Sequence, residues 1–371
     1  MRPSAPLYDA LADSYDEHFA APHRRAYDEL AWEIAASLLG PGPATVLDVG
    51  CGVGRWAERL VAAGHHVIGI EPAPAMAARA ATRLAGTAFT LIHAPVEHVH
   101  LTRTPTPGPP TPTTEPPAAG AAGSGAGSDS GLNGGSAAGS AAGSAAGSGG
   151  GSAAGSGGGS AAGSGRGSAA GSAAGSAPGS GGGSAGESGG GWSGSWGGES
   201  GEGPGRGSGR GDVLPPDGAD LVVAMGSLQY ASDPVAAIAR CAGWLRPGGA
   251  LCVLVDSRQA LVTELLAADR PDEALERLTT KRGVWRLGEH AADLHLLDAT
   301  ELAAAVRAAG LRVERVAGLL VGATVHGRAG LTARLNADYT AALAAERRLA
   351  AEPALADLGK QLLVTGRKPE R

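Results

Sequence analysis

Short apolar runs alternate with amphipathic segments along most of this chain. Segments such as RWAERLVAAG and DATELAAAVRAAG carry apolar residues at helical spacing, whereas the runs between them are short and continuous, as in buried strands. Because strands that alternate with helices form parallel sheets, we expect an α/β fold with a mostly parallel seven-stranded sheet and helices on both faces. The expected strands are 45–50, 66–71, 89–95, 219–226, 250–256, 312–321 and 360–369.

Helix start and stop signals support this division of the chain. The sequence GPGP ends a helical stretch at 7–39, and Gly64 follows the next helical segment as a C-terminal cap. Asp298, with Glu301 three residues later, forms a capping-box pattern at the start of another expected helix.

One long segment, 102–212, departs from this pattern and consists almost entirely of Gly, Ser, Ala and Pro. Such a sequence has few apolar side chains to bury against the backbone entropy it would lose, so we expect it to be disordered. The chain then divides into 1–101, the insert 102–212, and 213–371, and the two outer parts form one domain. Because the insert leads into a strand that runs towards the ligand edge of the sheet, we expect it to emerge at the opposite edge.

Charge and cysteine content argue against several classes of protein. The formal net charge of −6 gives no basic excess that would indicate a nucleic-acid partner. The three cysteines have no paired spacing, so we expect neither a disulfide framework nor a metal site. The N-terminal residues MRPSAPLYDALADSYDEHF contain no apolar signal core, and no apolar run is long enough to span a bilayer, so we expect a cytoplasmic protein without a membrane partner.

The stretch VLDVGCGVGRW joins the first expected strand to the next helix and is the candidate binding site for a nucleotide or cofactor. Its glycines, Gly50, Gly52 and Gly54, have the spacing G-x-G-x-G, with Cys51 inside the turn. A dinucleotide fingerprint needs G-x-G-x-x-G, but position 55 is Arg, and the Gly-Lys-Ser/Thr ending of a phosphate loop is absent.

Two carboxylates narrow the choice of ligand. Asp48 ends the first strand, where a negative charge faces a pyrophosphate poorly but suits an ammonium or a sulfonium. Glu71 ends the second strand, where an acid can accept hydrogen bonds from the ribose hydroxyls of a nucleoside. Together they describe a nucleoside with a cationic substituent and no phosphate, which is S-adenosylmethionine.

The segments DVGCGVG, HVIGIE and WLRPGGAL, in this order, resemble the class I S-adenosylmethionine-dependent methyltransferases, and the resemblance covers the chain except the insert. It implies a Rossmann-like fold in which Asp48 lies near the methionine amino group, the glycines allow close approach of the backbone, and Glu71 holds the ribose. The family often has an Asp at the end of the third strand, but this chain has Pro95 and Val96 there, so adenine would meet apolar and backbone groups.

The same resemblance implies three further contacts with the cofactor. Met225, with Gly226 and Leu228 after it, would line the floor beside the sulfonium. In the N-terminal stretch, Tyr15 would cover the cofactor and Arg24 would pair with its carboxylate.

Methyl transfer is an in-line displacement in which alignment supplies much of the rate, so no catalytic dyad is required. A general base is needed only for some acceptors, and Tyr230, His290 and His295 are the candidates. Asp256, at the end of the fifth strand, is a candidate contact with the acceptor.

The segment 257–296 is expected to form a lid of two helices and an irregular piece that selects the acceptor. We expect a small-molecule acceptor. The alternative is tRNA, because Lys281, Arg282 and Arg286 cluster around Trp285, and the lid and the tail from 345 resemble bacterial tRNA carboxymethoxyuridine carboxyl methyltransferases. A second alternative is a scaffold that retains the cofactor fold without catalysis.

Overall fold

The computed structural model describes residues 1–103, 213–215 and 217–370. The insert 102–212, expected to be disordered, therefore lies outside the described residues except for Thr102 and Arg103.

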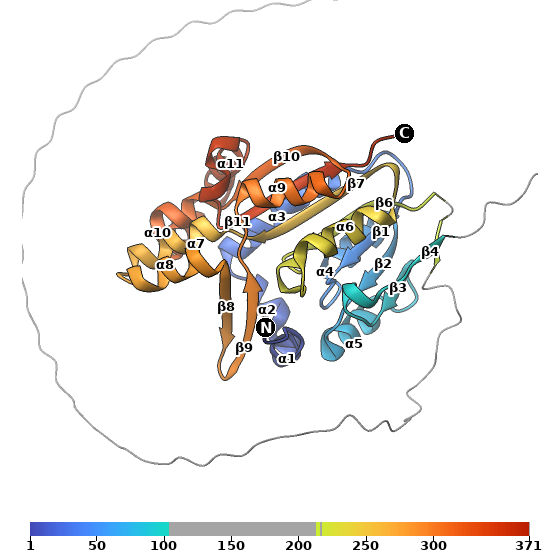
Figure 1. Ribbon diagram of the computed structural model, residues 1–371, viewed down its shortest axis with the longest axis horizontal. Helices are drawn as coiled ribbons and strands as arrows, with labels where there is room; N and C mark the ends of the chain where they lie inside the picture. The colour runs from blue at the N-terminus through green and yellow to red at the C-terminus, as the bar shows by residue number, and fades with distance from the viewer. Residues whose placement is uncertain (104–212, 216, 371) are drawn as a thin grey trace, which may run out of the picture. The chain divides into compact units, whose positions relative to one another are not determined.

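A seven-stranded sheet forms the centre of the described chain (Figure 1). The strand β11 runs antiparallel to both of its neighbours, and the other pairs in this sheet are parallel. Each of the seven predicted strands is present, so the predicted α/β, Rossmann-like architecture is confirmed. In spatial order the strands are β10 (Arg312–Leu319), β11 (Gln361–Arg367), β7 (Leu245–Asp256), β6 (Ala219–Met225), β1 (Thr45–Val49), β2 (His66–Ile70) and β3 (Phe89–Ile92).

Helices cover both faces of this sheet because its strand residues point alternately to either side. In β1, Val46 packs with one set of helices and Leu47 with the other, and both are fully buried. The first set is α3 (Pro22–Ala36), α4 (Arg55–Ala62), α10 (Val321–Ala337) and α11 (Tyr339–Ala350). The second set is α6 (Pro234–Trp244) and α9 (Ala299–Ala308).

The N-terminal stretch is not one continuous helix. It forms α1 (Ala5–Leu11), η1 (Ala12–Ser14) and α2 (Tyr15–Phe19) before α3 begins at Pro22. The break has a local cause, since proline is favoured in the first turn of a helix and disfavours its continuation from before.

The predicted lid contains a hairpin instead of an irregular piece. Its two helices are present as α7 (Arg258–Ala267) and α8 (Pro271–Thr280). They are followed by the antiparallel strands β8 (Arg282–Leu287) and β9 (His290–His295), joined by Gly288 and Glu289. A two-residue loop with glycine first is a strong hairpin signal, and the prediction overlooked it.

The residues on either side of the insert lie together at one end of the sheet. The strand β4 (Thr102–Arg103) pairs in parallel with β5 (Val213–Leu214), which precedes the amino end of β6. The guanidinium of Arg103 donates to the carbonyls of Gly243 and Leu245, where β7 begins. These stems therefore lie opposite the carboxyl ends of β1, β2 and β6, as the sequence predicted.

Short elements complete the described chain. The helix α5 (Pro74–Arg83) follows β2, and three further turns are η2 (Val96–His98), η3 (Leu228–Tyr230) and η4 (Pro353–Leu358).

Candidate cofactor and acceptor site

The glycine turn after β1 depends on left-handed backbone and close packing. Gly50 has φ +72°, and a Cβ on it would lie 2.2 Å from the Cβ of Ser227. Gly52 has φ +56° and lies beside the ring of Tyr15. Gly54 serves helix packing instead, since a Cβ there would meet Leu84 just after α5.

Glu71 fastens this turn to the end of β2. Its two carboxylate oxygens accept hydrogen bonds of 2.8 Å each from the backbone N–H groups of Gly52 and Ala73. Burial raises the pKa of Glu71 to about 7, against the two backbone hydrogen bonds, which lower it. Each oxygen keeps a free lone pair, so this carboxylate can also accept hydrogen bonds from a ligand.

Asp48 is a buried carboxylate beneath the turn, with 2% of its surface exposed. The backbone N–H of Ala57 donates to it, but its Oδ2 atom has no hydrogen-bond partner. Burial, followed by the charge of Glu71, raises the pKa of Asp48 to about 7. A cationic ligand would compensate this charge, so the orphaned oxygen fits the ligand inferred from the sequence.

A cavity of about 410 Å³, here called the glycine-turn pocket, lies above this turn. The first residues of the chain, from Met1 to Ala5, form part of its wall. Cys51 does not line this pocket, because its side chain is buried and its sulfur packs against Gly69. Asp48 and Gly54 do not line it either. The predicted residues that do are Tyr15, Gly50, Gly52, Glu71, Pro95, Val96, Met225, Gly226 and Leu228.

A second cavity of about 260 Å³, the aromatic pocket, adjoins the first. The rings of Tyr8, Tyr15, Phe19, Tyr27, Tyr230 and Trp285 line it, together with the imidazoles of His18 and His23. Five residues line both pockets: Tyr8, Tyr15, Met225, Gly226 and Tyr230. The two cavities therefore share a wall at the carboxyl end of β6.

Sequence reasoning missed Tyr8, which lies at this shared wall. Its ring centroid is 5.6 Å from that of Tyr230, and the two phenols form a hydrogen bond. Burial raises the pKa of both, that of Tyr230 to about 12, so each stays protonated at neutral pH. One phenol donates to the other, which keeps its own O–H to donate to a ligand. A signal existed, because the pair Tyr-Asp occurs at 8–9 and again at 15–16, two helical turns later.

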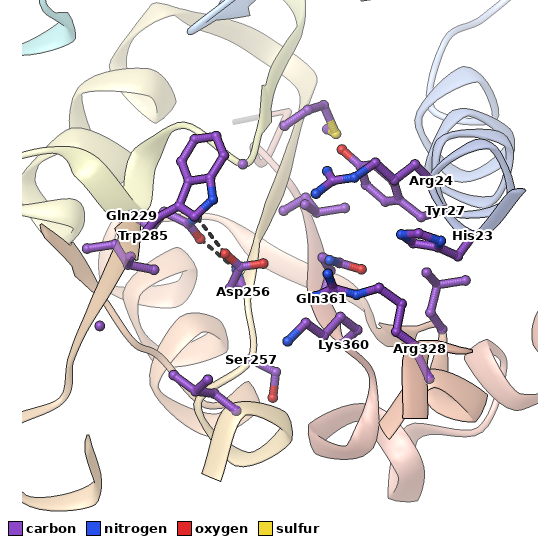
Figure 2. A pocket seen from close by; sticks show the side chains of 18 of the residues that line it. His23, Arg24, Tyr27, Gln229, Asp256, Ser257, Trp285, Arg328, Lys360 and Gln361 are labelled. Atoms are coloured by element: carbon purple, nitrogen blue, oxygen red, sulfur yellow. Dashed lines mark hydrogen bonds between the residues drawn. The ribbon is translucent and has the colours of Figure 1, made fainter. Parts of the chain in front are cut away.

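The aromatic pocket has polar groups on opposite sides (Figure 2). On one side, Gln229 Nε2 donates to Asp256 Oδ2 at 3.0 Å, and the Asp256 N–H donates to Gln229 Oε1 at 2.6 Å. On the other side, Arg24, Arg328 and Lys360 point into the cavity. Arg24, predicted to reach the cofactor, lines the aromatic pocket and not the glycine-turn pocket.

The two predicted histidine bases lie away from both pockets. His295 Nε2 is 2.8 Å from the guanidinium of Arg282, and burial lowers the pKa of the imidazole. His290 lies beside the hairpin turn. Of the three candidate bases, only Tyr230 lines either of these two pockets.

The basic cluster expected around Trp285 is dispersed. Lys281 forms an ion pair of 2.6 Å with Glu301, while Arg286 is exposed. Trp285 faces the aromatic pocket, with its ring centroid 5.3 Å from that of Tyr8.

Acidic side chains hold the N-terminal helices over the two pockets. Asp9 accepts a hydrogen bond of 2.8 Å from the N–H of Ala75 at the start of α5. Asp13 pairs with Arg79 and Asp16 with Arg83 on the same helix. These contacts fix α1 and α2, and so the positions of Tyr8 and Tyr15. Asp9, Asp13 and Asp16 thus act as anchors for the pocket walls.

The described part of the chain has neither a membrane-spanning helix nor a metal-binding cluster. No described helix combines the length and apolar character needed to cross a membrane. Among these same residues, no group of three or more His, Cys, Asp or Glu side chains is arranged to hold a metal ion.

One family model and several solved structures match this chain. Residues 19–316 match a family model described as a methyltransferase domain. An S-adenosylmethionine-dependent methyltransferase from Mesorhizobium loti is 12% identical, with 91% of this chain and 98% of that chain covered and a TM-score of 0.43. A second, from Methanosarcina mazei, is 10% identical, with 91% and 98% covered and a TM-score of 0.43. No curated protein matched the chain.

Proposed function

We propose that this chain, which belongs to the family of methyltransferase domains and uses S-adenosylmethionine, methylates a small molecule held in the aromatic pocket. The observation that carries the proposal is the wall shared by the two cavities, formed by Tyr8, Tyr15, Met225, Gly226 and Tyr230. A methyl donor in one cavity and an acceptor in the other would lie next to each other at these shared residues.

The glycine-turn pocket offers the contacts that the cofactor requires. Gly50 and Gly52 admit it close to the backbone, Glu71 offers lone pairs to ribose hydroxyls, and Asp48 supplies a negative charge beneath. Pro95 and Val96 provide an apolar surface for adenine. When bound, S-adenosylmethionine supplies an electrophilic methyl group on a positively charged sulfur.

The residues of the aromatic pocket orient the acceptor and exclude water from it. The aromatic walls can stack on a planar group, and the Tyr8–Tyr230 pair can donate its one free phenol O–H to that group. Asp256 is held in a fixed orientation by Gln229 and can accept a hydrogen bond or a proton from a hydroxyl or an amine.

Two observations favour a small molecule over tRNA. Lys281 is neutralised by Glu301, and neither Arg282 nor Arg286 lines the aromatic pocket, so the basic residues of the lid do not surround the candidate acceptor site. The formal net charge of −6 also gives no general attraction for a polyanion.

Transfer of label from methyl-labelled S-adenosylmethionine tests the proposal. The full chain is incubated separately with a small-metabolite extract and with total RNA, and Asp48→Ala is the comparison variant. We expect label in the metabolite fraction with the wild type and much less with Asp48→Ala. Label in RNA alone would refute the small-molecule acceptor, and failure of the wild type to bind the cofactor in calorimetry would refute the use of this pocket.

A further inference from the structure

The aromatic pocket contains two guanidinium groups without an acidic partner. Among the described residues, no carboxylate forms an ion pair with Arg24 or with Arg328. The third cation, Lys360, is neutralised by an ion pair of 2.6 Å with Glu264. Arg24 is partly buried on α3, and Arg328 is exposed just after the kink that Gly327 makes in α10.

Neighbouring groups respond to this uncompensated positive charge. The pKa of His18 is lowered to about 4, by burial first and then by the charges of Arg24, His23 and Arg328. The pKa of His23 is also lowered, by burial, Arg328 and Arg24. The two imidazoles are therefore neutral at pH 7, and the pKa of Arg24 is itself lowered by burial and by the charge of Arg328.

The opposite side of the same cavity carries a hydrogen-bond acceptor. Asp256 faces the basic side chains in Figure 2, with its orientation fixed by Gln229. A ligand that spans the cavity therefore meets positive charge at one end and a carboxylate at the other, with Tyr27 beside the basic groups and Trp285 beside the carboxylate.

We propose that the acceptor carries an anionic group, a carboxylate or a phosphate, held by Arg24 and Arg328, and a hydroxyl or amine that faces Asp256. The anion relieves the repulsion between the guanidiniums and forms charge-assisted hydrogen bonds with them. This inference rests on the proposed function, because it names the class of molecule that the aromatic pocket receives.

The anion belongs to the acceptor and not to the cofactor. Arg24 and Arg328 both line the aromatic pocket, and neither lines the glycine-turn pocket. A cofactor carboxylate in the glycine-turn pocket would therefore leave Arg328 without a partner.

The test compares acids with their neutral counterparts by calorimetry, on the full chain saturated with S-adenosylhomocysteine. The first two pairs are 4-hydroxybenzoate with 4-hydroxybenzamide and 4-hydroxyphenylacetate with its amide. The third pair is 4-hydroxyphenyl phosphate with 4-methoxyphenol, in which a neutral methoxy group replaces the phosphate. The phosphate pair separates the two kinds of anion. The variants are Arg328→Gln and Arg24→Gln, and Arg307→Gln, which is exposed on α9, is the matched control.

We expect at least one acid to bind about tenfold or more tightly than its neutral counterpart, as a charge-assisted hydrogen bond implies. Arg328→Gln and Arg24→Gln should each remove most of this preference, and Arg307→Gln should leave it intact. No preference in any pair, or an unchanged preference in Arg328→Gln, would overturn the inference. Binding of S-adenosylhomocysteine is measured first, so a failure of the cofactor site is distinguished from a failure of this inference.

Discussion

Replacing Asp48 by Asn should separate stability from cofactor binding. In the ligand-free protein the pKa of Asp48 is raised from 3.8 to about 7, mainly by burial. At about 1.4 kcal/mol for each factor of ten in proton affinity, the ionised carboxylate costs the folded state about 4 kcal/mol at most. This cost is absent below about pH 4, grows as the pH rises, and is complete above about pH 7.

The amide removes the charge but leaves its own N–H groups unpaired, at a cost of about 1–3 kcal/mol. We therefore expect ligand-free Asp48→Asn to be about 1–3 kcal/mol more stable than the wild type at pH 8. At pH 4.5 it should be equal or less stable, because little of the wild-type penalty remains to be removed. Urea unfolding at both pH values measures this difference, with the exposed Asp272→Asn as the control.

Cofactor binding should change in the opposite sense. The buried charge of Asp48 lies beneath the turn, and compensation of such a charge by a cationic ligand contributes about 1.5–3 kcal/mol. Asp48→Asn should therefore weaken the binding of S-adenosylmethionine about tenfold to a hundredfold in calorimetry. Wild-type affinity should also rise between pH 6 and pH 8 as the carboxylate ionises, and this rise should shrink in the variant. A variant that is less stable than the wild type at pH 8, or that binds the cofactor equally well, would refute the reasoning.

Three further predictions follow from contacts in the same site. Gly50→Ala should lower the free energy of unfolding by about 2 kcal/mol or more, because its Cβ would collide with Ser227; Gly86→Ala, at a similar φ of +74° in open space, isolates the backbone strain, and equal losses in urea unfolding would contradict the collision. Glu71→Gln should weaken the binding of the cofactor in calorimetry, since an amide oxygen replaces only one of two acceptors; unchanged affinity would count against ribose binding. Replacing 105–210 by a short Gly-Ser linker should leave cofactor affinity within about twofold in calorimetry, because the stems lie at the opposite edge of the sheet and closure depends weakly on length; a tenfold loss would contradict this.

The sequence predicted the sheet and the glycine turn because their signals are local. Each strand is a continuous apolar run, and Asp48, Gly50 and Glu71 lie at strand ends where parallel topology brings them together. The depth of Asp48 beneath the turn could not be predicted, because it depends on how α4 covers the strand.

The aromatic pocket was only partly predictable for the same reason. Trp285 was noted for its basic neighbours, but the hairpin directs the ring away from them, because side chains alternate between the two faces of a strand. Arg328 and Lys360 lie on segments without a motif, and only the packing of α10 and the start of β11 brings them to β7. Such long-range placement leaves no periodicity in the sequence.

The pairing of β1 with β6 has a consequence for how the enzyme could be divided. Residues 1–103 contribute β1, β2 and β3, and residues from 213 onward contribute the other four strands, so these halves of the sheet meet at the single β1–β6 seam. The first half carries Gly50 and Glu71, and the second carries Asp256 and Arg328. Two separately expressed fragments would therefore each be inactive, and methyl transfer would report their reassociation, as in a split-enzyme assay.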